Sequence, residues 1–170
     1  GNSFGQWNSY FDAVEGISES LPHMAVIGNH ETYGDQFDSG KFYALHFNNP
    51  KNGVGVLNDL TDVESLGTIT RGVVRNFDDS AYSFDYGNTH FAVINTGTDW
   101  DEEGTMKIVA EQAKWLDEDL SESDKQWKIV MLHQSMYPAK TERYSTKAPL
   151  LDVIDKHEVD LVLQGHDHMV

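Results

Sequence analysis

The residues with the clearest capacity for chemistry are His166 and His168, which flank Asp167 close to the end of the sequence. An apolar run at residues 159–163 precedes them, separated only by Gln164-Gly165. Two histidines separated by one residue after a strand can bind one metal ion together or turn toward two different ions. A polar turn is the alternative interpretation, but it offers no reason for two histidines. We therefore interpret the pair as metal ligands.

Two other apolar runs lead to residues of the same kind. Residues 24–27 lead to Gly28-Asn29-His30-Glu31, and residues 129–132 lead to His133. Taken singly, the first is explained equally well by a capped turn, and the second by a buried structural histidine. Together with His166 and His168 they give four histidines and one amide, a donor set without thiolates. Such a set suits Zn, Mn or Fe rather than Ca or a four-cysteine structural zinc site.

The donor set is incomplete for two ions. A two-metal site normally has a carboxylate that bridges ions about 3.5–4 Å apart, and no acidic residue of the sequence has an obvious claim to that role. Glu31 follows His30, and alternation points Asp167 away from its neighbours, so we interpret both acids as supporting groups. The remaining histidines fall outside the set and are interpreted as structural: His23, His46, His90 and His157.

The order of the expected elements explains how these segments meet. Helix, strand and polar loop occur three times, which predicts a layered α/β domain with helices packed on a sheet. In open α/β sheets the ligand crevice lies outside the carboxyl ends of the strands, where all three candidate segments fall. Gly87-Asn88 suits a two-residue hairpin turn of type I′ or II′. The expected helices are residues 6–20, 105–122 and a segment around Leu150, Leu151 and Ile154; the expected strands are residues 24–27, 81–86, 89–95, 129–132 and 159–163; residues 33–76 are expected to be irregular.

Composition narrows the classes of function. A chain of 170 residues with 39% hydrophobic and 24% charged residues has the size and composition of one globular domain. Its net charge of −16 repels nucleic-acid backbones, so no nucleic-acid partner is expected. No window approaches the roughly 18 apolar residues that a membrane helix needs, so no membrane segment is expected. The absence of cysteine excludes disulfides, thiolate metal sites and a cysteine nucleophile.

Several motifs in this order and spacing point to one family. They are Gly28-Asn29-His30-Glu31, the hairpin 82–87, residues 130–133 with Met136-Tyr137, and residues 159–163 leading to Gly165-His166-Asp167-His168. The chain resembles the calcineurin-like metallophosphoesterases and, within them, the purple acid phosphatase-like branch. The resemblance runs through nearly the whole chain and is weakest in its middle. It implies a layered β-sandwich flanked by helices.

The resemblance also implies roles for the site residues. Asn29, His133 and His166 would bind one ion, and His168 would bind the other. His30 would lie just outside the ligands, where it donates a proton to the leaving oxygen or stabilises charge on phosphate. The implied cofactors are two divalent or trivalent ions (Fe, Zn or Mn). A hydroxide activated between them would hydrolyse a small phosphorylated substrate, as in an acid phosphatase. An extracellular or cell-surface location is implied by the resemblance alone.

Departures from the family pattern set further expectations. The family's first two motifs, which supply aspartate ligands and in purple enzymes a tyrosine, are absent, and the sequence opens without an initiator Met. Residues 1–170 are therefore expected to be a single but partial catalytic domain that lacks its first βαβ portion. Alone it is expected to bind metal weakly and to show little activity. Residues 140–143 replace a loop in which plant-type members place histidines, so Lys140 or Arg143 is a candidate for contact with phosphate.

Three alternatives stay open at this point. The first is a phosphodiesterase of the same superfamily. The second is a phosphoesterase-like binding module without catalysis. The third is a hydrolase with one zinc ion held by His133, His166 and His168, and it predicts one ion per chain. The sequence does not indicate the oligomeric state.

Overall fold

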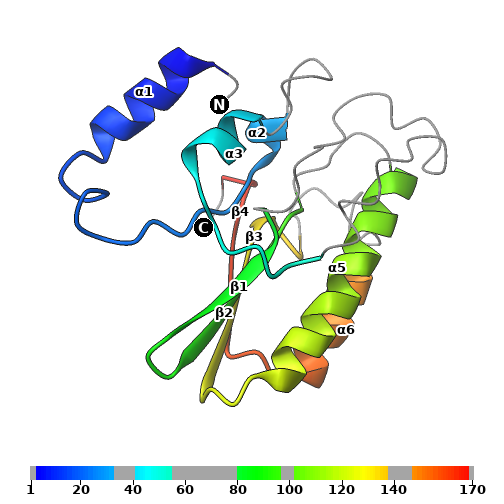
Figure 1. Cartoon of the computed structure of the whole chain (residues 1–170). Helices are drawn as coiled ribbons and strands as arrows, with labels where there is room; N and C mark the ends of the chain where they lie inside the picture. Colours follow the sequence, from blue (N-terminus) through cyan, green and yellow to red (C-terminus); the bar gives the residue numbers. More distant parts are fainter. Residues whose placement is uncertain (1–2, 33–40, 55–79, 97–101, 138–146, 169–170) are drawn as a thin grey trace.

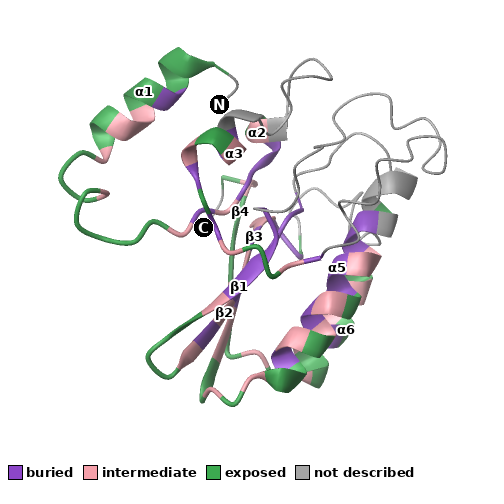
Figure 2. Ribbon diagram, viewed as in Figure 1, coloured by how far each residue is buried: buried purple, intermediate pink, exposed green. Residues whose placement is uncertain are grey.

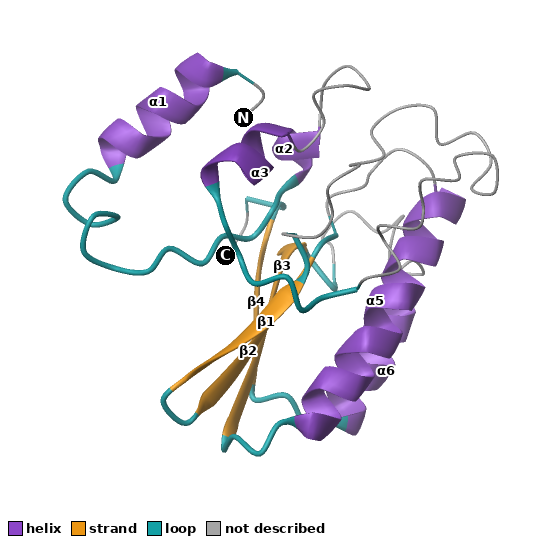
Figure 3. Cartoon of the chain, in the orientation of Figure 1, coloured by secondary structure: helices purple, strands orange, loops and turns teal. Residues whose placement is uncertain are grey.

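A computed structural model describes residues 3–32, 41–54, 80–96, 102–137 and 147–168. Helices and strands alternate along the second half of the chain, and short helices occupy the first part (Figures 1 and 3). The helices are α1 (Phe4–Ala13), α2 (Asn29–Thr32), α3 (Lys41–His46), α5 (Glu102–Glu122) and α6 (Ala148–Lys156). The strands are β1 (Tyr82–Tyr86), β2 (Thr89–Ile94), β3 (Trp127–Gln134) and β4 (Leu161–Gly165).

The four strands form one mixed sheet in the order β1-β2-β3-β4. Strands β1 and β2 pair antiparallel, whereas β2–β3 and β3–β4 pair parallel. Helices α5 and α6 make the two crossovers that parallel neighbours require. The predicted α/β class, with helices packed on a sheet, is therefore confirmed. Among the described residues this is the one sheet, so the sandwich that the resemblance implies stays a prediction.

The hairpin was predicted almost to the residue. Residues 89–93 pair with residues 82–86, and Gly87 has φ 59° while Asn88 is not among the residues with positive φ. A positive φ at the first turn residue alone is the type II′ arrangement, one of the two that we expected.

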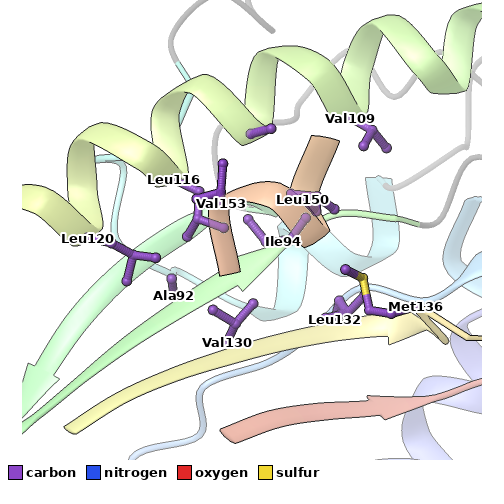
Figure 4. Close-up of a cluster of buried hydrophobic side chains, with 11 residues drawn as sticks. Ala92, Ile94, Val109, Leu116, Leu120, Val130, Leu132, Met136, Leu150 and Val153 are labelled. Carbon is purple, nitrogen blue, oxygen red and sulfur yellow. The ribbon is translucent and has the colours of Figure 1, made fainter. Parts of the chain in front are cut away.

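The main hydrophobic core lies between the sheet and the helix pair α5–α6. Figure 1 shows the two helices side by side over one face of the sheet, and Figure 2 shows a buried stripe along α5. In the core, drawn in Figure 4, Leu116 and Leu120 of α5 are fully buried against Ala92 and Val130 of the strands. Burying each leucine contributes about 1.5–3 kcal/mol, so this stripe fixes the helix on the sheet.

A second, aromatic cluster holds the first part of the chain. Trp7 of α1 packs with Tyr43 of α3 and with Phe47, Ala25 and Ile27. Helix α1 is shorter than the predicted helix 6–20, because residues 14–20 form turns and Gly16 has φ 80°. Such a φ interrupts a right-handed helix and suits glycine.

The predicted strand at residues 24–27 is wrong. These residues are extended without strand pairing, although Ala25 and Ile27 are buried as a strand's would be. The hydroxyls of Tyr43 and Tyr82 both donate to the Ala25 carbonyl, at 2.8 and 2.9 Å. That carbonyl therefore has side-chain partners in place of a neighbouring strand. From the sequence pattern alone, a buried segment without strand pairing cannot be distinguished from a buried strand.

Candidate metal centre

Strands β3 and β4 end at the same edge of the sheet, because they run parallel. Gln134 is the register partner of Gly165, and the register shifts between Met131 and Gln134. Side chains fix both ends: Thr96 Oγ1 accepts the Gln134 N–H at 2.9 Å, and Gln164 Oε1 accepts the Met136 N–H at 3.0 Å. His133, predicted to follow its strand, is the penultimate residue of β3.

Three predicted ligands meet at this edge. The Nε2 atom of His133 lies 2.8 Å from Oδ1 of Asn29 and 3.2 Å from Nδ1 of His166. The two imidazole rings lie nearly perpendicular, with centroids 5.1 Å apart and an interplanar angle of 80°. Asn29 is buried, and the two histidines are half-buried. The donor atoms of Asn29 and His166 thus both lie within hydrogen-bond distance of one atom, Nε2 of His133.

This arrangement fits a metal ion in both chemistry and spacing. Metal–nitrogen bonds of 2.0–2.1 Å separate neighbouring donors by about 2.8–3.0 Å in octahedral geometry and by about 3.3–3.4 Å in tetrahedral geometry. The separations of 2.8 and 3.2 Å in the structure fall within the span of these two ranges. Two imidazole nitrogens and one amide oxygen suit Zn, Mn or Fe. Small shifts would let all three donors face one ion.

Two glycines lie beside His133, and only Gly28 is close enough for an added Cβ atom to crowd the imidazole ring. A Cβ atom at Gly28 would lie 3.3 Å from both Cδ2 and Cε1 of the His133 ring. A Cβ atom at Gly165 would lie 3.7 Å from the His133 carbonyl oxygen and 4.0 Å from Nδ1. Gly28 is not among the glycines with positive φ, so close approach to the ring is its structural reason.

The segment after β4 adopts an uncommon backbone. His166 and His168 have φ of 74° and 54°, a region that few residues other than glycine occupy. Such conformations cluster at functional sites. His168 is nevertheless exposed, and within the described ranges it makes no contact with Asn29, His133 or His166. In that part of the chain no group of three or more histidines and acids converges on one point.

His30 and Glu31 follow Asn29 on helix α2. His30 is exposed, and both residues line a cavity of about 500 Å³ that also borders Trp7 and Tyr43. The Glu31 carboxylate accepts the Gly28 N–H at 3.1 Å, which holds the turn that presents Asn29. Glu31 therefore contacts the backbone of the site, as expected of a supporting group.

The four histidines interpreted as structural lie elsewhere. His46 stacks on Trp7 with ring centroids 4.9 Å apart, and His23 contacts the Tyr10 hydroxyl at 2.7 Å. His157 contacts Asp117 at 2.5 Å, and His90 lies between two carboxylates. The candidate phosphate contacts Lys140 and Arg143 lie outside the described residues.

The polar side chains that fix the strand ends were not predicted from the sequence. Thr96, Gln134 and Gln164 each lie beside a strand end. Their only sequence signal is a polar residue directly after an apolar run, which many loops share. Their role depends on which strands become neighbours.

None of the described helices is both long and apolar enough to serve as a membrane span.

Comparison with known proteins identifies related sequences. A model of the calcineurin-like phosphoesterase family matches residues 3–170. Relatives include probable inactive purple acid phosphatase 1 of Arabidopsis thaliana, 27% identical over 96% of this chain and 26% of that protein. Purple acid phosphatase 23 of Arabidopsis thaliana is 25% identical over 96% of this chain and 32% of that protein. Human acid phosphatase type 7 is 25% identical over 91% of this chain and 33% of that protein.

No solved structure matched the chain. The chain spans about a quarter to a third of the length of these relatives. The family match covers nearly every residue and includes the segments that carry Asn29, His133 and His166. With this match and these relatives, the chain belongs to the calcineurin-like phosphoesterase family, in its purple acid phosphatase-like branch.

Proposed function

We propose that this chain carries part of the active site of a phosphatase that hydrolyses phosphomonoesters with two metal ions. The observation that carries the proposal is the contact of Asn29 and His166 with one atom, Nε2 of His133. The imidazole nitrogen His133 Nε2 thus lies within hydrogen-bond distance of an amide oxygen and of a second imidazole nitrogen, which are donor types that Zn, Mn and Fe bind. The family assignment and the relatives named acid phosphatase support the same chemistry.

The proposed roles follow the positions of the side chains. Asn29, His133 and His166 bind one ion through Oδ1, Nε2 and Nδ1. His168 would bind the second ion. When bound, the ions would activate the nucleophile and neutralise the charge that develops on phosphate.

His30 is proposed as the proton donor to the leaving oxygen. It follows Asn29 on α2 and is exposed, so solvent can exchange protons with its imidazole. An imidazole titrates near neutral pH and can transfer a proton in either direction. The proposed substrate is a small phosphorylated molecule, and the proposed location, from family resemblance alone, is extracellular or at the cell surface.

Charge supports the need for metal ions. The chain carries 28 acidic and 12 basic residues, so its overall field repels a phosphate ester. Cations held at the edge of the sheet would reverse that field locally. This argument applies equally to a phosphodiesterase, which differs only in the substrate.

A second candidate is a phosphoesterase-like module that binds metal or phosphate without catalysis. Two observations favour it: several relatives are named probable inactive purple acid phosphatases, and within the described residues His168 makes no hydrogen bond with Asn29, His133 or His166. A site with one ion would then hold the substrate or a partner without turnover.

The test measures metal content and p-nitrophenyl phosphate hydrolysis together. The chain, and any longer form that carries it, is loaded with Zn²⁺, Mn²⁺ or Fe³⁺, and bound metal is counted. Two ions in the longer form, with turnover that His133→Ala abolishes and His157→Gln preserves, is the expected result. One ion with turnover indicates the mononuclear hydrolase, and metal without turnover indicates the binding module. Equal turnover in wild type and His133→Ala would overturn the proposed site.

A further inference from the structure

A buried histidine far from the candidate metal centre lies between two carboxylates. The Nδ1 atom of His90 lies 2.8 Å from Oδ1 of Asp85, and its Nε2 atom lies 2.7 Å from Oδ2 of Asp119. The His90 side chain is 8% exposed, compared with 15% for Asp119 and 50% for Asp85. His90 is on β2, Asp85 is its cross-strand partner on β1, and Asp119 is on α5. The cluster therefore joins the hairpin to the long helix that covers the sheet.

The geometry distinguishes between the two protonation states of the ring. A neutral imidazole has one N–H donor and one nitrogen lone pair. With carboxylate oxygens beside both nitrogens, a neutral ring would leave a lone pair facing an anionic oxygen at hydrogen-bond distance. An imidazolium donates at both nitrogens and satisfies both carboxylates. The structure thus favours the charged ring, and burial of the contact with Asp119 strengthens that preference.

We propose that Asp85, His90 and Asp119 form a pH-sensitive clasp between the β1–β2 hairpin and α5, closed when the imidazole is protonated and weakened when it is neutral. The clasp does not depend on the proposed phosphatase activity. It gives the fold a stabilising link that works best in mildly acidic solution.

Neighbouring groups position the clasp. Asp119 Oδ1 accepts the Ser83 hydroxyl at 2.7 Å, and Asn52 Oδ1 accepts the Ser83 N–H at 3.1 Å. Asp119 is therefore held by β1 as well as by the imidazole. The Ser83 contact holds the Asp119 carboxylate whether or not the His90 ring is charged.

Two cations also lie near the clasp. Lys125, which follows α5, has its Nζ atom 3.5 Å from Asp85 Oδ2 and 4.0 Å from Asp124 Oδ1. Lys128 on β3 is the register partner of His90, so its side chain leaves the sheet on the same face. Both lysines oppose protonation of His90, whereas the two closer carboxylates favour it. The carboxylates prevail because each makes a direct hydrogen bond.

The direction of the pH dependence follows from these contacts. The hydrogen bond with Asp119 is the main cause that raises the pKa of His90; burial opposes it and Asp85 adds to it. A raised folded-state pKa means that the stabilisation is complete below the ordinary histidine value of about 6.5. It is lost as pH rises through the folded-state pKa. The hydrogen bond with His90 lowers the pKa of Asp85, so the acid side of the clasp is lost only as pH falls through that lowered value.

Urea unfolding of the 170-residue chain tests the clasp. Wild type, Asp119→Asn and the control Glu118→Gln are compared at about pH 5.5 and about pH 9. Glu118 is the exposed neighbour of Asp119, so its substitution removes the same charge without touching the imidazole. We expect Asp119→Asn to reduce the folding equilibrium constant by about tenfold more at the lower pH than at the higher. Glu118→Gln should show no such difference, and an equal loss for Asp119→Asn at both pH values would overturn the clasp.

Nitrogen-15 NMR of the His90 ring gives a second, independent readout in the wild-type chain. Both ring nitrogens should carry protons at about pH 5.5, and deprotonation should occur above the ordinary histidine value of about 6.5. Deprotonation of His90 at or below that value would overturn the proposal even if Asp119→Asn failed to fold.

Discussion

The ring of His133 lies directly against the backbone of Gly28, close enough that a Cβ atom there would approach two ring carbons to 3.3 Å. Asn29, the next residue, contacts the same ring through its side-chain oxygen at 2.8 Å. Gly28 therefore leaves room for the His133 ring beside the backbone, and Asn29 places its side-chain oxygen against the same ring. The Gly-Asn dipeptide is explained by its contact with a residue more than 100 positions away.

Replacement of Gly28 by alanine tests this packing. The new methyl group would press on the His133 ring, which contacts with Asn29 and His166 hold in place, and on Glu31 Oε2 at 3.0 Å. We expect a loss of about 1–3 kcal/mol in the free energy of unfolding, measured in urea.

Gly5→Ala is the matched control for that substitution. Gly5 lies in helix α1 with nothing within 4 Å of an added Cβ atom. Alanine there should be neutral or stabilising by about 0.4–1 kcal/mol, because it restricts the unfolded chain. Equal losses for the two variants would show that the His133 contact carries no special cost.

Asn29 provides a sharper test of metal binding. Removing the amide in Asn29→Ala should weaken zinc affinity by about 10-fold or more, as loss of a ligand or of its support does. Asn29→Asp keeps an oxygen donor and adds charge, so its affinity should equal or exceed that of the wild type. Calorimetric titration of Zn²⁺ at fixed pH measures both.

Asn88→Ala, at an exposed position in the hairpin turn, is the control for the Asn29 variants. Within the described residues, the side-chain amide of Asn88 donates to the exposed Gln126 side chain at 2.7 Å. It lies in the turn of the hairpin, away from the candidate metal centre. Its zinc affinity should match that of the wild type. If Asn29→Ala also matched it, the amide would not be a ligand.

The parts of the fold that the sequence predicted are those determined by local pattern. The hairpin follows from alternating residues around Gly87-Asn88, and helix α5 follows from its apolar spacing. Residues 24–27 have the apolar composition of a buried strand without its pairing. In the structure the Ala25 carbonyl accepts the hydroxyls of Tyr43 and Tyr82 instead of pairing with a strand, and only folding brings these hydroxyls to Ala25.

The candidate site could be predicted in part for a related reason. Parallel neighbours end at one edge, so His133 and His166 were expected to meet, and they do. The position of His168 could not be inferred, because it depends on the left-handed backbone after β4. His90 was interpreted as structural, which its burial supports. Its carboxylate partners required knowledge of which face of α5 meets the hairpin.

A buried glutamine connects α5 to the end of β2 and supplies a stability prediction. Gln112 is fully buried, and its side chain both accepts the Asn95 N–H and donates to the Asn95 carbonyl, each at 2.8 Å. Gln112→Leu would remove one hydrogen bond from each of these two buried backbone groups of Asn95. We expect a loss of about 2–4 kcal/mol in urea unfolding. Gln126→Leu, at an exposed position, should change stability by less than about 0.5 kcal/mol.

Asp117 on α5 gives a second pH-dependent prediction, opposite in sign to that of His90. Hydrogen bonds from Lys156 and then His157 lower the pKa of the Asp117 carboxyl, with Lys156 Nζ at 2.6 Å and His157 Nε2 at 2.5 Å. A lowered folded-state pKa means that the stabilisation is present above the ordinary value of about 3.9 and is lost as pH falls through the folded-state value.

Carbon-13 NMR of the Asp117 carboxyl measures that titration. Lys156→Met removes the main cause of the shift, so the pKa of Asp117 should rise toward its ordinary value. Lys114→Met removes an equal charge that pairs with Glu111 instead, and the pKa of Asp117 should stay where it is in the wild type. An unchanged Asp117 titration in Lys156→Met would mean that the ammonium does not hold this carboxylate in solution. The docking of α6 on α5 would then depend on the contact of His157 with Asp117 and on the apolar core that includes Leu116 and Val153.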